Sequence, residues 1–190
     1  MNFRLTTLSA AALALLAAGC GGSDDPDAVI NVLPAGFTEH GMQQYGATAP
    51  GAGTTAASQD LLTAGLGKTG LGTAAAPAYA DPLNPTALEL RRNAIHANYR
   101  AILDFSANGG YGRLYGPNVD NAGNPTLGEG LIPGKENIAS IDDGSGKKKV
   151  VVAVQIPASF DVNNPCIVAG PSSGSRGVYG SIGSAAEWGL

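Results

Sequence analysis

The sequence predicts an α/β fold, in which a partial sheet and its helices follow a long irregular, loop-rich amino-terminal region. Three observations predict this fold class. Residues 86–105 carry the apolar spacing of an amphipathic helix, and residues 138–156 carry the pattern of a β-hairpin. The apolar run 166–169 then leads into a glycine- and serine-rich turn at 170–177 and a small-residue helix at about 181–188, so strands and helices alternate in the second half of the chain.

Length and charge limit what the chain can be and bind. Its 190 residues correspond to about one domain, and its formal charge is -4 with only 14% charged residues. The basic residues are scattered except for the run Lys147–Lys149, which is too small a basic surface for a phosphate backbone. We therefore expect no nucleic-acid partner, and we expect the lysine run to solvate the start of a strand.

The first twenty residues have the pattern of an export signal. Arg4 supplies a basic start, and the apolar stretch Leu5–Ala18 is shorter than the roughly twenty residues that cross a bilayer, so we predict a signal peptide over 1–19. Residues 16–20, Leu-Ala-Ala-Gly-Cys, are similar to a bacterial lipobox with the leucine one position early. We expect Cys20 to be lipidated and to anchor the exported chain to a membrane of the cell envelope. The alternative is an ordinary signal peptide with an incidental cysteine.

The segment after the signal is poor in large apolar residues. We expect a flexible tether and irregular segment over 20–57, and irregular structure packed on something larger over 28–85. With Cys20 lipidated, no disulfide can form within the chain. Cys166, which lies in an apolar run, is then expected to be a small buried hydrophobe.

The helix predicted over 86–105 begins with the start signals Pro85 and Thr86. One of its faces carries Leu88, Ile95, Tyr99 and Ile102. His96 lies one step from this face and is expected to contact solvent or a neighbouring element. A structural role is favoured for it, because no nucleophile lies nearby in the sequence.

A glycine- and tyrosine-rich loop at 109–118 either lines a cleft or turns the chain, and the turn is favoured. A strand at 138–141, a turn at 142–146 and a strand at 150–156 form the predicted hairpin. Asp142 and Asp143 are interpreted as turn residues, since adjacent side chains at a strand end point in opposite directions and cannot share one proton-transfer site.

After Pro157 ends this strand, we expect an exposed loop at 158–165 and then a strand at 166–169 that is buried on both faces. The turn that follows matches G-x-S-x-G at Gly170–Gly174. In one interpretation the turn is a nucleophile elbow, with Ser172 as the catalytic nucleophile.

In the favoured interpretation, the turn is instead an oxyanion loop whose backbone N–H groups receive the negative charge of a tetrahedral intermediate. The order of a hairpin, a buried strand and a glycine-rich turn is typical of an α/β-hydrolase-like sheet before its elbow, and Pro171 leaves little room for a strained nucleophile. The oxyanion and substrate-binding candidates are Ser172, Ser173, Gly174, Ser175, Arg176 and Gly177. A plain structural turn is the third alternative.

Four separated stretches, 60–71, 111–118, 142–146 and 172–180, together resemble the amino-terminal region of the D-3-hydroxybutyrate oligomer hydrolase family. The likeness runs from about residue 58 to the end, which implies that 58–190 is the amino-terminal part of an α/β-hydrolase-like esterase domain. Members of that family are longer, and they split soluble 3-hydroxybutyrate oligomers left by polyhydroxybutyrate breakdown into monomers with a serine charge-relay system.

The chain departs from the family because it carries no acid and histidine after the turn. Its two histidines, His40 and His96, precede the turn, whereas the charge-relay order is serine, acid, histidine. We therefore expect the remainder of the enzyme to follow Leu190, and this part alone to be inactive. In the whole enzyme Arg176 either orients a substrate carboxylate or forms an ordinary ion pair.

The resemblance implies 3-hydroxybutyrate oligomers as the substrate. We expect no cofactor and no metal, because no ligand cluster or phosphate-binding motif is present in the sequence. The competing class is a non-enzymatic envelope lipoprotein with a structural or binding role, in which the glycine-rich loops serve packing alone.

Overall fold

The computed structural model describes residues 33–48, 53–106, 108–111, 119, 122, 124, 128–172 and 177–185. The chain divides into two compact units, Met1–Leu33 and Pro34–Leu190, and every helix and strand described below belongs to the second unit. The predicted signal peptide and Cys20 lie outside the described residues. In the part of the chain that is described, no helix is both long enough and apolar enough to cross a membrane.

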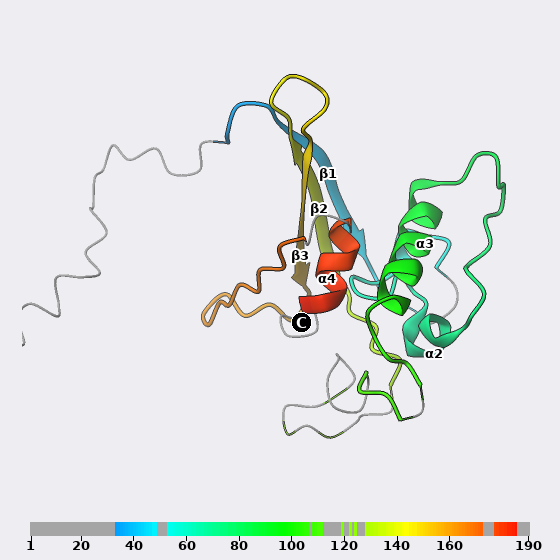
Figure 1. The fold of residues 1–190 in the computed structure, drawn as a ribbon. Coiled ribbons are helices and arrows are strands. Elements are labelled where there is room, and N and C mark those ends of the chain that lie inside the picture. The colour runs from blue at the N-terminus through cyan, green and yellow to red at the C-terminus, as the bar shows by residue number, and fades with distance from the viewer. Residues whose placement is uncertain are drawn as a thin grey trace, which may run out of the picture. The chain divides into compact units, whose positions relative to one another are not determined.

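A three-stranded antiparallel sheet with the order β1-β2-β3 forms one layer of the second unit (Figure 1). Its strands are β1 (Phe37–Tyr45), β2 (Gly134–Ile141) and β3 (Val150–Pro157). The predicted hairpin is confirmed as β2 and β3. The prediction of irregular structure over 28–85 is wrong for Phe37–Tyr45 and for the short helices Ala56–Ser58 and Gly67–Gly72. Phe37–Tyr45 is polar and becomes a strand because β2 pairs with it, and composition alone does not indicate such a partner.

The turn between β2 and β3 is built as predicted. Asp142 Oδ1 accepts the N–H groups of Gly144 at 2.7 Å and Gly146 at 3.0 Å, and both glycines have positive φ angles. Asp143 Oδ1 accepts the N–H of Ser145 at 3.0 Å. The lysine run that follows is exposed and leads directly into β3. Both aspartates are therefore turn residues.

Strand β1 contains a β-bulge. Glu39 pairs with Ala139 and Met42 pairs with Asn137, so two residues of β1, His40 and Gly41, stand opposite one residue of β2. Gly41 has a φ of +94°, a conformation that L side chains rarely adopt. The glycine therefore permits the bulge at this position.

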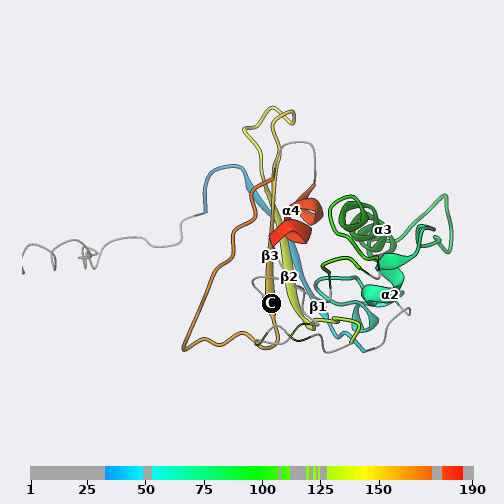
Figure 2. The same cartoon turned by 60° about the horizontal axis from the view of Figure 1, so that its bottom comes forward.

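Helices α3 (Ala87–Arg100) and α4 (Val178–Ala185) lie on the same side of the sheet, and α4 contacts both α3 and β3 (Figures 1 and 2). The prediction of α3 is confirmed. A capping box between Thr86 and Glu89 begins it, as the sequence indicates. It ends at Arg100 rather than at Phe105, and Asp104 instead accepts the N–H of Ser106 in a local turn.

The apolar core lies between α3, the short helix α2 (Gly67–Gly72) and the chain around residue 111. Its largest fully buried side chains are Leu62, Leu71, Ile95, Tyr99 and Tyr111. A short 3-10 helix, η1 (Ala56–Ser58), leads into the buried turn at 60–65. The carboxylate of Asp60 holds that turn, because it accepts the N–H groups of Leu62, Thr63 and Gly65.

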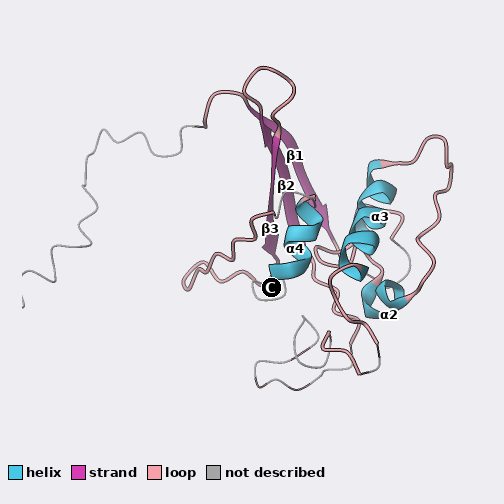
Figure 3. Ribbon diagram, in the orientation of Figure 1, coloured by secondary structure: helices cyan, strands magenta, loops and turns pink. Residues whose placement is uncertain are grey.

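The predicted buried strand at 166–169 is not formed. These residues are exposed and carry no strand hydrogen bonds, and the side chain of Ile167 is 92% exposed (Figure 3). Cys166 is an exposed free cysteine, so its predicted burial is also wrong. A strand buried on both faces needs neighbouring strands and covering helices, and the described residues provide none for this segment. The preceding loop at 158–165 is exposed, as predicted.

Candidate functional site

The turn at 170–177 is the segment to which the sequence assigns chemistry. Gly170, Pro171, Ser172 and Gly177 are described and are exposed to solvent. The other candidates, Ser173, Gly174, Ser175 and Arg176, lie outside the described residues. The described ends of the turn thus lie at the surface, where a substrate can reach them, and they lead into α4. That helix begins at Val178, three positions before its predicted start.

Two glycines let α4 pack closely against its surroundings. A Cβ atom on Gly183 would lie 2.6 Å from ring atoms of Tyr99, so α3 and α4 approach each other at a position that excludes a side chain. A Cβ atom on Gly170 would lie 2.9 Å from the carbonyl oxygen of Ser181. The start of the turn therefore packs against the backbone of the helix that the turn leads into.

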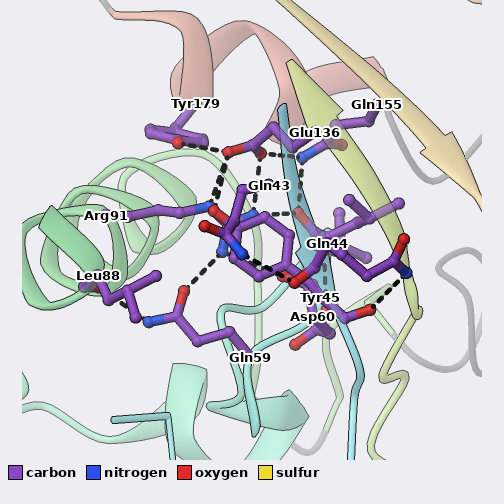
Figure 4. Close-up of polar contacts among 12 residues, drawn as sticks. Gln43, Gln44, Tyr45, Gln59, Asp60, Leu88, Arg91, Glu136, Gln155 and Tyr179 are labelled. Carbon is purple, nitrogen blue, oxygen red and sulfur yellow. Dashed lines mark hydrogen bonds and ion pairs between the residues drawn. The ribbon is translucent and has the colours of Figure 1, made fainter. Parts of the chain in front are cut away.

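Tyr179 connects α4 to the sheet through a buried polar cluster (Figure 4). Its hydroxyl donates a hydrogen bond to Glu136 Oε1 on β2 at 3.0 Å. Tyr45 on β1 reaches the same oxygen at 3.4 Å, and Gln155 Nε2 on β3 donates to Glu136 Oε2 at 2.8 Å. All three strands and α4 thus meet at the carboxylate of Glu136. Tyr179, which brings α4 to it, lies two residues in sequence beyond the end of the turn.

Arg91 on α3 provides the charge that balances Glu136. Its Nε and Nη2 atoms donate to the two carboxylate oxygens, each at 2.9 Å, and both side chains are at least 95% buried. Its remaining N–H groups donate to Gln59 Oε1 at 2.9 Å and to the carbonyl oxygens of Asp60 and Leu61 at 3.1 Å. The guanidinium carbon lies 4.0 Å from the centroid of the Tyr45 ring. A buried ion pair of this kind is stabilised by such complete hydrogen bonding.

The cluster changes the protonation equilibria of its members. Burial alone would raise the pKa of Glu136, but the hydrogen bonds and charge of Arg91, with hydrogen bonds from Gln155 and Tyr179, outweigh burial and hold that pKa below its ordinary value. Burial, with a further contribution from Glu136, raises the pKa of Tyr45 to about 12, although the charge of Arg91 opposes this. Burial and Glu136 also raise the pKa of Tyr179. The pair is therefore charged and the phenols are neutral at physiological pH.

These properties suit the cluster for support rather than for proton transfer. Glu136 accepts hydrogen bonds from four side chains, and its Arg91 partner is bonded on every side that the geometry allows. Gln155 also donates to the carbonyl of Leu61 at 2.7 Å, and Gln59 donates to the carbonyls of Gly53 and Leu88 at 2.9 Å. The Arg91–Glu136 cluster fixes α4, and with it the end of the turn, relative to the sheet.

Both histidines bond within the fold. His40 Nε2 lies 2.8 Å from Ser140 Oγ, which joins β1 to β2. His96 is buried and its Nε2 donates to the carbonyl oxygen of Thr73 at 3.1 Å, so it contacts a neighbouring segment rather than solvent. The contact of His96 supports the structural role that the sequence favours for it.

No group of three or more histidine, cysteine, aspartate or glutamate side chains suited to a metal ion occurs among the described residues. An open pocket of about 460 Å³ lies beside α2, lined by Lys68, Thr69, Gly72, Thr73, Phe105, Gly128 and Glu129. The carboxylate of Glu129 already accepts the N–H and the hydroxyl of Thr69, at 2.8 and 2.6 Å. The acid among the described lining residues is therefore already hydrogen-bonded within the fold.

Sequence reasoning missed the Arg91–Glu136 cluster, although a signal was present. Arg91 lies four residues before Ile95, on the apolar face of the predicted helix, where a charged residue requires a buried partner. Glu136 gave no comparable signal, because it precedes the strand that was predicted to begin at Ile138. Only the fold brings it to Arg91.

Comparison with known proteins gives consistent matches. The family described as 3HB-oligomer hydrolase matches residues 15–190. A relative named D-(-)-3-hydroxybutyrate oligomer hydrolase from Polaromonas naphthalenivorans is 61% identical over 186 residues, which are 98% of this chain and 25% of the relative. Relatives with the same name occur in Burkholderia vietnamiensis, 69% identical over 134 residues (70% of this chain, 19% of the relative), and in Burkholderia thailandensis, 56% identical over 187 residues (98% and 26%).

The chain thus spans about a quarter of the length of the curated relatives that it matches over nearly all its residues. No solved structure is significantly similar to it.

Proposed function

The chain belongs to the 3HB-oligomer hydrolase family, and we propose that it is the amino-terminal part of a secreted carboxylic-ester hydrolase that cleaves 3-hydroxybutyrate oligomers to monomers. The observation that carries this proposal is the family match over residues 15–190, together with relatives that bear that name and are 56–61% identical over 98% of the chain. The oligomers are products of polyhydroxybutyrate degradation, so the enzyme acts on short soluble esters.

The proposed reaction proceeds through a serine acyl-enzyme. A serine oxygen attacks the ester carbonyl carbon while its proton passes to a base, and the C–O bond to the leaving hydroxybutyrate breaks as that alkoxide takes up the proton. Water then attacks the acyl-serine, which releases the second acid and restores the serine. In this scheme the nucleophile, acid and histidine come from the part of the enzyme that follows Leu190, and the chain alone is inactive.

In the whole enzyme, the turn at 170–177 supplies backbone N–H groups to the oxygen that becomes negative during the attack. Its solvent-exposed ends support this role, and so does the attachment of α4 through Tyr179, Gly170 and Gly183. A donor set fixed before the reaction stabilises the developing charge without a reorganisation cost. Arg176 serves as a candidate for binding the terminal carboxylate of the substrate.

The proposed site of action is outside the cytoplasm. The apolar stretch Leu5–Ala18 and the lipobox-like residues before Cys20 support cleavage after residue 19 and lipidation of the cysteine. Expression with a radiolabelled fatty acid tests this part of the proposal. Label that is incorporated into the parent chain and absent from Cys20→Ala is the expected result, and label in neither protein contradicts the anchor.

The hydrolase proposal is tested with this chain alone and with a chimera. In the chimera, residues 1–190 replace the matched quarter of the Polaromonas relative. We expect the chimera, but not the chain alone, to release monomer from hydroxybutyrate dimer and trimer. A soluble, folded chimera that leaves both esters intact contradicts the proposed substrate.

Two variants of the chimera separate the interpretations of the turn. Gly174→Pro removes one backbone N–H, and loss of one oxyanion donor is expected to lower kcat by about 10²–10³-fold with little change in KM. Ser172→Ala keeps every N–H and is expected to retain most activity, as is the control Ser159→Ala in the exposed loop before residue 165. Complete loss of activity in Ser172→Ala alone supports the nucleophile elbow instead.

A further inference from the structure

The two edges of the sheet differ in how they meet solvent. The edge strand β1 is interrupted by its bulge and carries mainly polar residues, among them Thr38, Glu39, His40, Gln43 and Gln44. Bulges and polar side chains are the features with which natural proteins protect a free edge from further pairing. Strand β1 therefore has the character of a true outer edge.

The opposite edge, β3, has none of these features. It pairs with β2 in an unbroken register from Val150 to Pro157, and no described residue pairs with its outer side. Its sequence, Val-Val-Val-Ala-Val-Gln-Ile-Pro, is apolar at seven of eight positions. A long, regular, apolar edge of this kind is a template for another strand.

One face of β3 is also uncovered. Gln155 points into the Glu136 cluster on the face that carries α3 and α4, so the residues that alternate with it point to the other face of the sheet. Those residues are Val150, Val152, Val154 and Ile156, with 60%, 39%, 51% and 43% of their surfaces exposed. Four β-branched side chains in a row thus face solvent on the strand whose edge is unpaired.

We infer that the free edge and the uncovered face of β3 form the joint between this region and the rest of the hydrolase. The occupant is a strand, with an apolar covering layer, from the polypeptide that in the longer family members follows the region matched here. This inference rests on the proposed function, in which the chain is the amino-terminal part of such an enzyme. Pairing turns β3 from an edge into an interior strand, and the covering layer buries its four aliphatic side chains.

The size of the relatives supports this occupant. The matched proteins are about four times as long as this chain, so members of the family carry ample polypeptide to cover the joint. The exposed segment 166–169 is a second apolar run that has no strand partner among the described residues, and it lies close in sequence to β3. Near-continuous apolar strands are typical of sheets that are covered on both faces.

Hydrogen exchange compares the isolated chain with the chimera defined above. In the isolated chain, the β3 amides that point away from β2 are expected to exchange rapidly. In the chimera we expect them to exchange about 100-fold more slowly, because a second ladder protects them. Equal exchange in the two proteins overturns the inference. Protection in the isolated chain that disappears on dilution also overturns it, because the occupant is then a second copy of this chain.

A charged substitution tests whether the uncovered face of β3 becomes buried in the longer protein. Val152→Lys is expected to leave the thermal unfolding midpoint of the isolated chain almost unchanged, and to lower that of the chimera clearly. The control Leu83→Lys, at a loop position that is 89% exposed, is expected to be silent in both. If Val152→Lys is equally silent in the chimera, the uncovered face is not the joint.

These readouts are independent of the reaction. A chimera that hydrolyses the oligomers while β3 stays unprotected overturns the joint and leaves the proposed function intact. A chimera in which β3 is protected but the oligomers are not cleaved supports the joint and contradicts the proposed function.

Discussion

The two faces of the sheet differ in what completes them. On the inner face, Glu136 receives hydrogen bonds from Arg91, Tyr45, Gln155 and Tyr179, so residues from α3, α4 and all three strands complete one another. On the outer face, β3 offers aliphatic side chains to solvent. Around Glu136 the inner face is thus completed by this chain, although Val151 at its end is 45% exposed, whereas the outer face exposes four aliphatic side chains in a row. The following four changes test that difference, beginning with the largest expected effect.

Arg91→Met breaks the inner face. The substitution leaves the buried carboxylate of Glu136 without its counter-charge, and removal of one partner from a buried pair costs about 3–5 kcal/mol. Urea unfolding followed by circular dichroism measures this loss. The matched control is Arg100→Met on the same helix, which removes one hydrogen bond from an exposed side chain to the carbonyl of Leu71 and is expected to cost less than about 1 kcal/mol. Similar losses in the two variants contradict the importance of the pair.

Low pH is expected to lower the free energy of unfolding, because it protonates the carboxylate of Glu136 on the inner face. The native pKa of Glu136 lies below its value in the unfolded chain, which is about 4.3. The unfolded state therefore binds the proton more readily, and the stability that Glu136 contributes is present above that pH and is lost as pH falls through the lower native pKa. Exposed carboxylates such as Glu89 also have lowered pKa values. The difference in unfolding free energy between the parent and Glu136→Gln, measured from pH 6 to 3, isolates Glu136 and should shrink toward low pH.

Tyr179→Phe loosens only the link between α4 and the sheet. Its hydroxyl lies 3.0 Å from Glu136 Oε1, whereas that of Tyr45 lies 3.4 Å from the same atom. A hydrogen bond to a charged group contributes about 1.5–3 kcal/mol, so we expect a loss in this range for Tyr179→Phe and a smaller one for Tyr45→Phe. Chemical denaturation of the two variants makes the comparison. A larger loss for Tyr45→Phe contradicts the assignment of Tyr179 as the main attachment of α4.

Val154→Thr probes the outer face with the smallest expected effect. Half of this side chain is exposed, and threonine is also β-branched, so we expect a change within about 0.5 kcal/mol in the isolated chain. A thermal melt of the isolated chain measures the change. A loss above about 1 kcal/mol would mean that the outer face is already covered by this chain.

Local signals made much of the fold predictable. The hairpin follows from the turn chemistry of Asp142, Gly144 and Gly146, and α3 follows from the capping residues Thr86 and Glu89. These patterns are completed within a few residues of the chain. Such turn and capping patterns therefore predict structure without knowledge of the tertiary contacts around them.

The failures concern elements that depend on distant partners. The strand at 166–169 was predicted from an apolar run, but such a run becomes a strand only beside other strands, and here it stays exposed. β1 was missed because its polar residues carry no strand pattern. The inner cluster was missed because Arg91 and Glu136 are 45 positions apart in sequence. The oxyanion role of the turn at 170–177 remains a prediction.

The bulge at His40 and Gly41 also determines which face of the sheet the later side chains of β1 point to. Thr38 and Tyr45 are an odd number of positions apart, yet both pair with β2 residues on the inner face, because the extra residue reverses the alternation between them. A regular strand with the same number of residues would send the Tyr45 ring to the opposite face of the sheet, away from the guanidinium of Arg91. The extra residue of the bulge thus decides which face of the sheet receives the Tyr45 ring.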